Sequence, residues 1–195
     1  MTAFIERIAP HATQLVRKDH TDVLALFHRY RANVSPRMKR GLVRSVCLAL
    51  EVHAQVEEEL LYPAVREVST SEFLRKAVPE HDEMRRLIAL LREMDPGDSR
   101  FDGTFMELMR DVIHHVADEE TSFLPEAERV LRGRLGELGV RMMQRRVALL
   151  APRAPALAYN RARALPVRSL ALMAGIVLGG VWIGNRLSDA SAGQA

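Results

Sequence analysis

Cysteine is nearly absent from this 195-residue sequence, in which Cys47 stands alone. A single cysteine excludes an intrachain disulfide and a cysteine-based zinc cluster, and it is typical of proteins from a reducing compartment. Aromatic residues are also scarce, at 5% of the chain. The N-terminal segment has no apolar stretch behind a basic start, so we expect no secretory signal there.

Acidic residues are missing from one long stretch. None stands between Glu137 and Asp189, so residues 138–195 carry eight Arg and one Asp, whereas residues 1–137 carry 20 Lys or Arg and 24 Asp or Glu. The net charge of +3 therefore joins a mildly acidic domain to a basic C-terminal region. That region is either a solvated face or a surface attracted to anionic lipid or nucleic acid. Nucleic acid is the less favoured partner, because no nucleic-acid-binding motif accompanies the arginines.

The abundant residues favour helices. The chain is 48% hydrophobic and 27% charged, and Ala, Leu, Glu, Arg and Met are its common residues. Apolar residues recur at helical spacing. This predicts helices over residues 11–32, 36–66, 69–94, 101–123 and 134–150, with N-cap candidates at 69–71. Pro79 should kink or restart the third helix, and Pro125 should open a turn. Short connections predict an all-α fold, an up-down four-helix bundle over residues 1–150 with a further C-terminal helix.

The sequence contains an internal repeat. Residues 53–63 read HAQVEEELLYP and residues 115–125 read HVADEETSFLP, so that His, a Glu four residues later, a second Glu and a Pro recur 62 residues apart. The segments KDHTDV and PEHDEM place His20 and His81 61 residues apart. Residues four apart share one helix face, so each repeat can direct an imidazole and a carboxylate into the bundle interior. The candidate metal ligands are His20, His53, Glu57, His81, His115 and Glu119.

This donor set suits a first-row metal such as iron, manganese or zinc. Each glutamate has two oxygens and could bridge a pair of ions. A vacant position on iron could bind oxygen, peroxide or nitric oxide. The plainer interpretation is a duplicated structural half whose histidines are ordinary core residues, but buried carboxylates without partners would cost several kcal/mol.

The four quoted segments resemble the hemerythrin-like domains of the type built from two His-His-Glu units, over roughly residues 12–150. The resemblance implies a four-helix bundle around a non-haem di-iron centre, oxo- or hydroxo-bridged and carboxylate-bridged, with the six candidate residues as ligands. Oxygen-carrying members have a second histidine four residues after the one in their third helix. Arg85 stands at that position here. The departure favours sensing, iron handling or peroxide chemistry over reversible oxygen carriage.

Several neighbours of the motifs have less certain roles. His114 precedes His115 and is an alternative ligand, although the repeat alignment favours His115. Glu58 and Glu120 follow the bridging candidates and are expected to be surface groups or to orient a ligand. Tyr62 is expected to pack beside its motif, with a redox role as the less favoured alternative.

Residues 169–185 contain no charged side chain. As a helix these 17 residues would span about 25 Å, against about 30 Å of bilayer hydrocarbon. We expect a single membrane anchor at 169–186, preceded by an Arg-, Pro- and Ala-rich linker at 151–168 and followed by a short polar tail at 187–195. The alternative is a segment that packs back on the domain. Glycines spaced by four could pair helices of two copies of the chain. Arginines on the N-terminal side would place the metal domain in the cytoplasm; a soluble cytoplasmic protein is the alternative.

These features predict a membrane-tethered di-iron protein that binds, senses or reduces a small oxidant. An iron-handling module without turnover is the alternative. The sequence leaves open whether the protein is an enzyme.

Overall fold

The computed structural model describes residues 10–163, and every regular element within that range is helical. The predicted all-α class is therefore confirmed for this part of the chain. The α-helices are α2 (Ala12–Arg29), α3 (Pro36–Val56), α4 (Tyr62–Arg66), α5 (Phe73–Glu93), α6 (Phe101–Asp118), α7 (Leu124–Val130), α8 (Leu135–Leu150) and α9 (Ala154–Arg163). Two π-helical turns, η1 (Glu57–Leu61) and η2 (Glu119–Phe123), and a 3₁₀ turn, η3 (Ala151–Arg153), complete the set.

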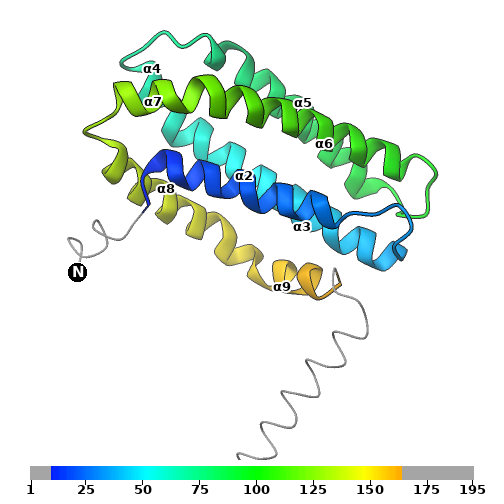
Figure 1. Ribbon diagram of the computed structural model, residues 1–195. Coiled ribbons are helices and arrows are strands. Elements are labelled where there is room, and N and C mark those ends of the chain that lie inside the picture. The colour runs from blue at the N-terminus through cyan, green and yellow to red at the C-terminus, as the bar shows by residue number, and fades with distance from the viewer. Residues whose placement is uncertain (1–9, 164–195) are drawn as a thin grey trace, which may run out of the picture.

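Four long arms run up and down to form the bundle (Figure 1). The first arm is α2, the second is α3 continued through η1 into α4, the third is α5, and the fourth is α6 continued through η2 into α7. Ser35 caps α3 by accepting a hydrogen bond from the Met38 backbone N–H, with Pro36 at the first helical position. The turn before α6 is closed by Asp98 N–H donating to the Asp95 carbonyl. The bundle topology follows the prediction.

Two prolines expected to kink, restart or end a helix lie within helical segments. α5 continues through Pro79, and Pro125 lies in the first turn of α7 rather than in a connecting turn. A proline ring has no N–H and collides with the carbonyl four residues earlier in a regular helix. A π turn lies directly before Pro125, and another lies before Pro63 in the first half: Leu124 N–H bonds Glu119 O and Tyr62 N–H bonds Glu57 O, five residues back. These wider turns leave room for the two proline rings.

The third arm also begins later than predicted. α5 starts at Phe73, and its N-cap, Glu72, makes no side-chain capping bond. The hydroxyl of Ser69 instead donates to Glu126 Oε1 at 2.5 Å. The serine cluster therefore joins the α4–α5 connection to α7 rather than capping the helix.

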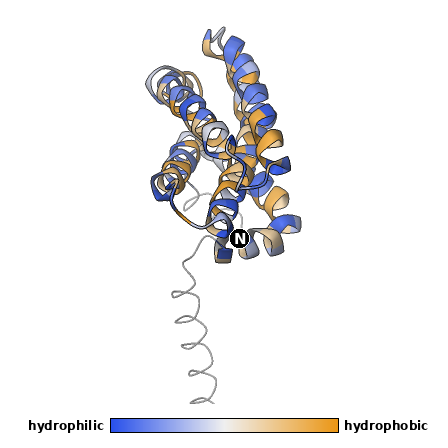
Figure 2. Ribbon diagram, turned by 90° about the vertical axis from the view of Figure 1, so that its right-hand side faces the viewer, coloured by the Kyte–Doolittle hydropathy of each residue, from blue (hydrophilic) through white to orange (hydrophobic). Residues whose placement is uncertain are grey.

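Two hydrophobic clusters lie along the bundle, and the candidate ligands lie between them. One cluster includes Leu15, Leu61, Phe73 and Phe123, and the other includes residues such as Phe27, Leu87, Phe105 and Leu108. Along α2, along α5 and from α6 into η2, the chain passes from one cluster through a buried histidine to the other. Hydrophilic and hydrophobic residues alternate along the helical ribbons (Figure 2). The polar site is thus enclosed by apolar layers at both ends.

α8 and α9 form an additional layer beside α2 and α3 (Figure 1). Gly139 lets α8 approach the start of α2, because a Cβ there would collide with the Pro10 carbonyl oxygen and lie 3.0 Å from the Ala12 nitrogen. Residues 151–163, expected to belong to a linker, are helical, and α9 packs against α3. Pro152 stands in the first turn of its helical segment, where a missing N–H costs nothing.

Within residues 10–163, no helix is both long and apolar enough to cross a membrane. The expected anchor at 169–186 and the tail at 187–195 lie outside the described residues.

Candidate metal centre

The structure brings all six candidate ligands together in the middle of the bundle. His20 comes from α2, His53 from the end of α3, His81 from α5 and His115 from the end of α6, and the two glutamates open the π turns. All six are buried, with at most 7% of each residue exposed. They fall into two groups whose potential ligand atoms lie within 4.8 Å of one another: His20, His53, Glu57 and Glu119, and Glu57, His81 and His115.

The inner imidazole nitrogens point at the glutamates. His20 Nε2 lies 3.0 Å from Glu119 Oε2, and His53 Nε2 lies 3.3 Å from Glu57 Oε2. The remaining two inner nitrogens are farther from a carboxylate: His81 Nε2 is 3.7 Å from Glu57 Oε2, and His115 Nε2 is 3.9 Å from Glu119 Oε2. His81 Nε2 and His115 Nε2 are themselves 3.2 Å apart. The donor atoms therefore converge on one small volume.

The outer nitrogens of the same imidazoles face a second set of carboxylates. Glu120 Oε1 is 2.7 Å from His20 Nδ1, Glu58 Oε1 is 2.8 Å from His81 Nδ1, and Glu80 Oε2 is 2.7 Å from His115 Nδ1. The fourth, Asp19 Oδ2, lies 3.6 Å from His53 Nδ1. An outer carboxylate holds the Nδ1–H tautomer, which leaves Nε2 free as a donor for a metal.

Burial and neighbouring charges shift the pKa values of the histidines in different directions. Burial lowers the pKa of His53 to about 3, and repulsion from His20 adds to this effect. Burial also lowers the pKa of His115 to about 4. For His20 burial lowers the pKa, but the carboxylates of Glu119 and Glu120 outweigh it and raise the pKa above its usual value. Two of the imidazoles are therefore neutral at pH 7, as metal binding requires.

The pKa values of the two central carboxylates, Glu57 and Glu119, are shifted in opposite directions. Burial and the neighbouring Glu119 charge raise the pKa of Glu57 well above its usual value. Burial acts on Glu119 in the same direction, but the imidazoles of His20, His53 and His115 outweigh it and lower the pKa. Like charges this close cannot both be ionised without a compensating cation.

Unpartnered polar atoms provide the test of whether a metal fits. Among the described residues, His20 Nε2, Glu57 Oε1 and both carboxylate oxygens of Glu119 are buried without a hydrogen-bond partner. His20 Nε2 and Glu119 Oε2 are 3.0 Å apart, but their geometry is not that of a hydrogen bond. Leaving such atoms unpaired costs several kcal/mol, so native structures rarely do so. A divalent cation would satisfy all of them and neutralise the carboxylates. The donor set of imidazole nitrogens and carboxylate oxygens suits a first-row transition metal.

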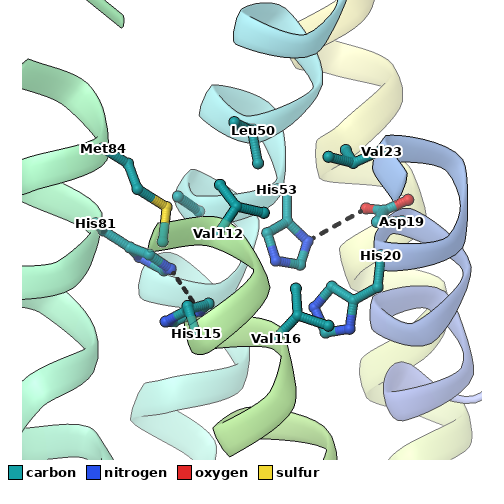
Figure 3. A pocket seen from close by; sticks show the side chains of 11 residues that line it. Asp19, His20, Val23, Leu50, His53, His81, Met84, Val112, His115 and Val116 are labelled. Atoms are coloured by element: carbon teal, nitrogen blue, oxygen red, sulfur yellow. Dashed lines mark hydrogen bonds and ion pairs between the residues drawn. The ribbon is translucent and has the colours of Figure 1, made fainter. Parts of the chain in front are cut away.

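A cavity of about 20 Å³ opens on the histidine side of the site. In Figure 3 the imidazoles of His81 and His115 lie on one side of it and those of His53 and His20 on the other. Its remaining lining is mostly apolar and includes Val23, Leu50, Ala54, Met84, Val112 and Val116. This volume holds about one water-sized molecule. The cavity therefore admits a small molecule and excludes a large one.

The less certain neighbours have defined positions. His114 is exposed, so the structure favours His115. Glu58 and Glu120 contact imidazoles as expected for orienting groups. Arg85 Nη2 donates to both oxygens of Glu58 at 2.7 Å, so it fixes the outer partner of His81 in place of offering another donor. Tyr62 packs against its motif, but its hydroxyl also donates to Glu57 Oε2 at 3.1 Å.

The sequence did not lead us to expect Asp19 and Glu80 as partners of the candidate histidines. A signal was present, because each directly precedes a candidate histidine, in KDH and in PEH. The two π turns that begin at the glutamates were not expected either. Such turns occur often at functional sites.

The chain has recognisable relatives. A DNA nickase from Nostoc sp. (strain PCC 7120) is 29% identical over 108 residues, which cover 55% of this chain but only 31% of that protein. No solved structure matches the chain. The family model of the hemerythrin HHE cation binding domain matches residues 11–127, the segment that carries all six clustered residues. The chain therefore belongs to the hemerythrin HHE cation-binding family.

Proposed function

We propose that the protein holds two iron ions between His20, His53, Glu57, His81, His115 and Glu119, and that it binds, senses or reduces a small oxidant there. The observation that carries the proposal is a set of convergent, buried donors, several of whose atoms have no hydrogen-bond partner, in a chain of a cation-binding family. Glu57 belongs to both donor groups, so it is the natural bridging residue between two ions.

Bound iron would supply a change of oxidation state and an exchangeable coordination position. The chain's own residues would do the rest. The outer carboxylates hold each imidazole in its donor tautomer and orientation. The Tyr62 hydroxyl donates to Glu57 and so restrains a carboxylate that would otherwise rotate. The apolar wall of the cavity keeps bulk water from the histidine face.

The size of the cavity supports a small oxidant as the ligand. A volume of about 20 Å³ with apolar walls suits oxygen, nitric oxide or peroxide better than an organic substrate. Arg85 supports reactions other than reversible oxygen carriage, because its guanidinium is bound to Glu58 and Asp82 and it offers no metal donor.

The experiment is a reaction of the reduced, iron-loaded chain with hydrogen peroxide. We expect the bound iron to be oxidised when peroxide is mixed with the chain. When a reductant is also present, we expect each chain to consume many equivalents of peroxide. Ala54→Val places two further methyl groups in the cavity and should slow oxidation about tenfold with iron content unchanged. A single oxidation event without further peroxide consumption would support the alternative, an iron-handling module without turnover.

The relative's printed name motivates one further assay. The described part of the C-terminal region carries Arg141, Arg153 and Arg163 and contains no acidic residue after Glu137. Nicking of supercoiled plasmid by the iron-loaded chain, lost in the His115→Ala variant, would favour action on DNA. An intact plasmid would leave the small oxidant as the substrate.

The proposal includes a membrane tether at residues 169–186 with the metal domain on the cytoplasmic side. It is supported by 17 consecutive uncharged residues at 169–185 that follow an arginine-rich segment. The full chain should sediment with membranes, and deletion of residues 166–195 should release it. Recovery of the full chain in the soluble fraction would contradict the tether.

A further inference from the structure

One of the four imidazoles is held differently from the others. The outer nitrogens of His20, His81 and His115 each lie 2.7–2.8 Å from a carboxylate oxygen. His53 Nδ1 is 3.6 Å from Asp19 Oδ2, which is longer than a hydrogen bond. Figure 3 shows Asp19 and His53 facing each other across this longer gap. His53 is therefore the least firmly oriented of the four.

The carboxylate of Asp19 is bound by another group. Arg146 of α8 donates from Nη1 to Asp19 Oδ1. The Arg146 side chain is 28% exposed and that of Asp19 is 14% exposed, so the pair is largely withdrawn from solvent. Arg146, Asp19 and His53 line a small hollow together with Leu15, Val16, Val56, Glu57 and Met142. A charged pair in such surroundings is held more firmly than a pair on the surface.

The internal repeat provides a comparison within the same molecule. Glu80 corresponds to Asp19, because each precedes the histidine of its segment. The cation near Glu80 is Lys76, 3.9 Å away, and Lys76 also pairs with Asp118. Glu80 keeps its 2.7 Å contact with His115. Between these two equivalent carboxylates, the one that a cation binds directly has the longer distance to its imidazole.

Glu58 is a different case: Arg85 and His81 both contact its Oε1, and its 2.8 Å contact with His81 is kept. Arg146 and His53 face different oxygens of Asp19.

We propose that Arg146 is a positioning residue that competes with His53 for Asp19 and thereby weakens metal binding in the group of His20, His53, Glu57 and Glu119. This inference rests on the metal site proposed above. An outer carboxylate orients a metal-binding imidazole and strengthens it as a donor, and loss of such a partner typically costs 10- to 100-fold in affinity. Arg146 withdraws part of that support at one metal position and leaves the other unaffected. α8, which lies outside the four-helix bundle, thus makes the two metal positions unequal.

The test is a titration of the full, metal-free chain with Fe²⁺ alone, without oxygen, against a competing chromophoric chelator. Two stepwise dissociation constants are determined for the unmodified chain and for Arg146→Met, which keeps the side-chain bulk and removes the charge. We expect one constant to fall about tenfold and the other to stay unchanged. Arg146→Lys, which keeps the charge, should resemble the unmodified chain. Lys76→Met, at the corresponding place in the other half, should leave both constants within twofold.

A second measurement separates this role from a structural one. Asp19→Asn should weaken metal binding, and Arg146→Met should have no further effect in the Asp19→Asn background, because Arg146 acts only through Asp19. Weaker binding in Arg146→Met, or an equal change in both constants, would overturn the inference and leave the metal site intact. A chain that binds no Fe²⁺ at all would overturn the metal site and the inference together.

Discussion

At the scale of single residues, the site consists of two layers. The inner layer directs Nε2 atoms and glutamate oxygens toward one another, and the outer layer sets carboxylates against Nδ1 atoms. The inner layer decides which ions can bind, because it supplies the donor atoms. The outer layer decides how firmly they bind, because it fixes the tautomer and the angle of each imidazole.

A substitution of Glu80 tests whether the outer carboxylates strengthen metal binding. Glu80→Gln keeps the size of the side chain but replaces a charged acceptor by a neutral one at 2.7 Å from His115 Nδ1. We expect metal affinity to fall roughly 10-fold. Glu83→Gln is the matched control in the same helix, since Glu83 pairs with Arg86 on the surface. Competition with a chelator measures both variants, and equal affinities would contradict a role for the outer carboxylate.

Acidification should destabilise the metal-free chain. The pKa of His53 is lowered to about 3 and that of His115 to about 4, mainly by burial. Stability associated with these neutral imidazoles is complete above the unfolded pKa of about 6.5 and is lost as pH falls toward the folded values. Between pH 6 and pH 4.5 the unfolded chain therefore binds more protons at these two positions than the folded chain does, and the difference approaches two near the middle of this range.

Other groups offset part of this effect. The pKa of Glu57 is raised well above its usual value by burial and by the Glu119 charge, so the folded chain takes up this proton at a higher pH than the unfolded chain does. The pKa of His20 is raised, so its contribution is present below pH 6.5 and is lost only as pH rises above that value. Each proton by which the two states differ changes the free energy of unfolding by roughly 1.4 kcal/mol for each pH unit, and we expect a net fall in stability over this range. Urea unfolding of the metal-free chain at pH 6, 5.5, 5 and 4.5 measures it, and a stability that stays level would contradict the assigned shifts.

The residues of the inner layer could be predicted from the sequence because the repeat pairs them at a fixed offset. Asp19 could not be assigned in the same way, because its role depends on Arg146, more than a hundred residues later in the chain. Tyr62 has no equivalent in the second half, where Leu124 occupies the corresponding place. Its hydrogen bond to Glu57 therefore leaves no signal in the repeat.

At the scale of elements, the two π turns place consecutive apolar residues in the core. Leu61 and Tyr62 follow one glutamate, Phe123 and Leu124 follow the other, and all four are almost completely buried. In a regular helix, neighbours in sequence point about 100° apart and only some face the core. Helical periodicity predicted the arms correctly but could not reveal these turns, because the pattern on either side of each turn remains helical.

α8 provides a test of element packing through two of its glycines. Gly139→Ala should destabilise the chain by about 2 kcal/mol, because the new Cβ would meet the backbone of Pro10 and Ala12. Gly136→Ala is the control, since a Cβ there meets nothing within 4 Å. It should stabilise the chain by about 0.5–1 kcal/mol through helix propensity. Denaturant unfolding measures both, and equal effects would show that α8 does not pack closely on α2.

The segment after α8 shows why its structure was hard to predict. Its prolines and arginines are typical of a linker, but Pro152 and Pro155 occupy early helical positions, and the alanines around them favour a helix. α9 then packs on α3. Local composition carried no information about this contact, because it depends on a surface formed by a distant part of the chain.

At the scale of the whole molecule, two similar halves enclose one site, and a C-terminal layer lies on one side of them (Figure 1). The repeat accounts for the approximate symmetry of the donors. Arg146 in α8, together with Tyr62 and Arg85, accounts for the departures from it. A symmetric bundle would treat two ions alike, whereas this arrangement gives each position different neighbours.

The most direct test of the central claim is the metal content of the full chain, purified from iron-replete cells, with an optical spectrum recorded beside it. We predict about two irons for each chain, as expected for the proposed pair of positions. His115→Ala and Glu119→Ala should each lose iron, because both residues are buried donors. His114→Ala, which alters the exposed neighbour, should keep it. A chain without stoichiometric metal, or equal loss in His114→Ala and His115→Ala, would contradict the account.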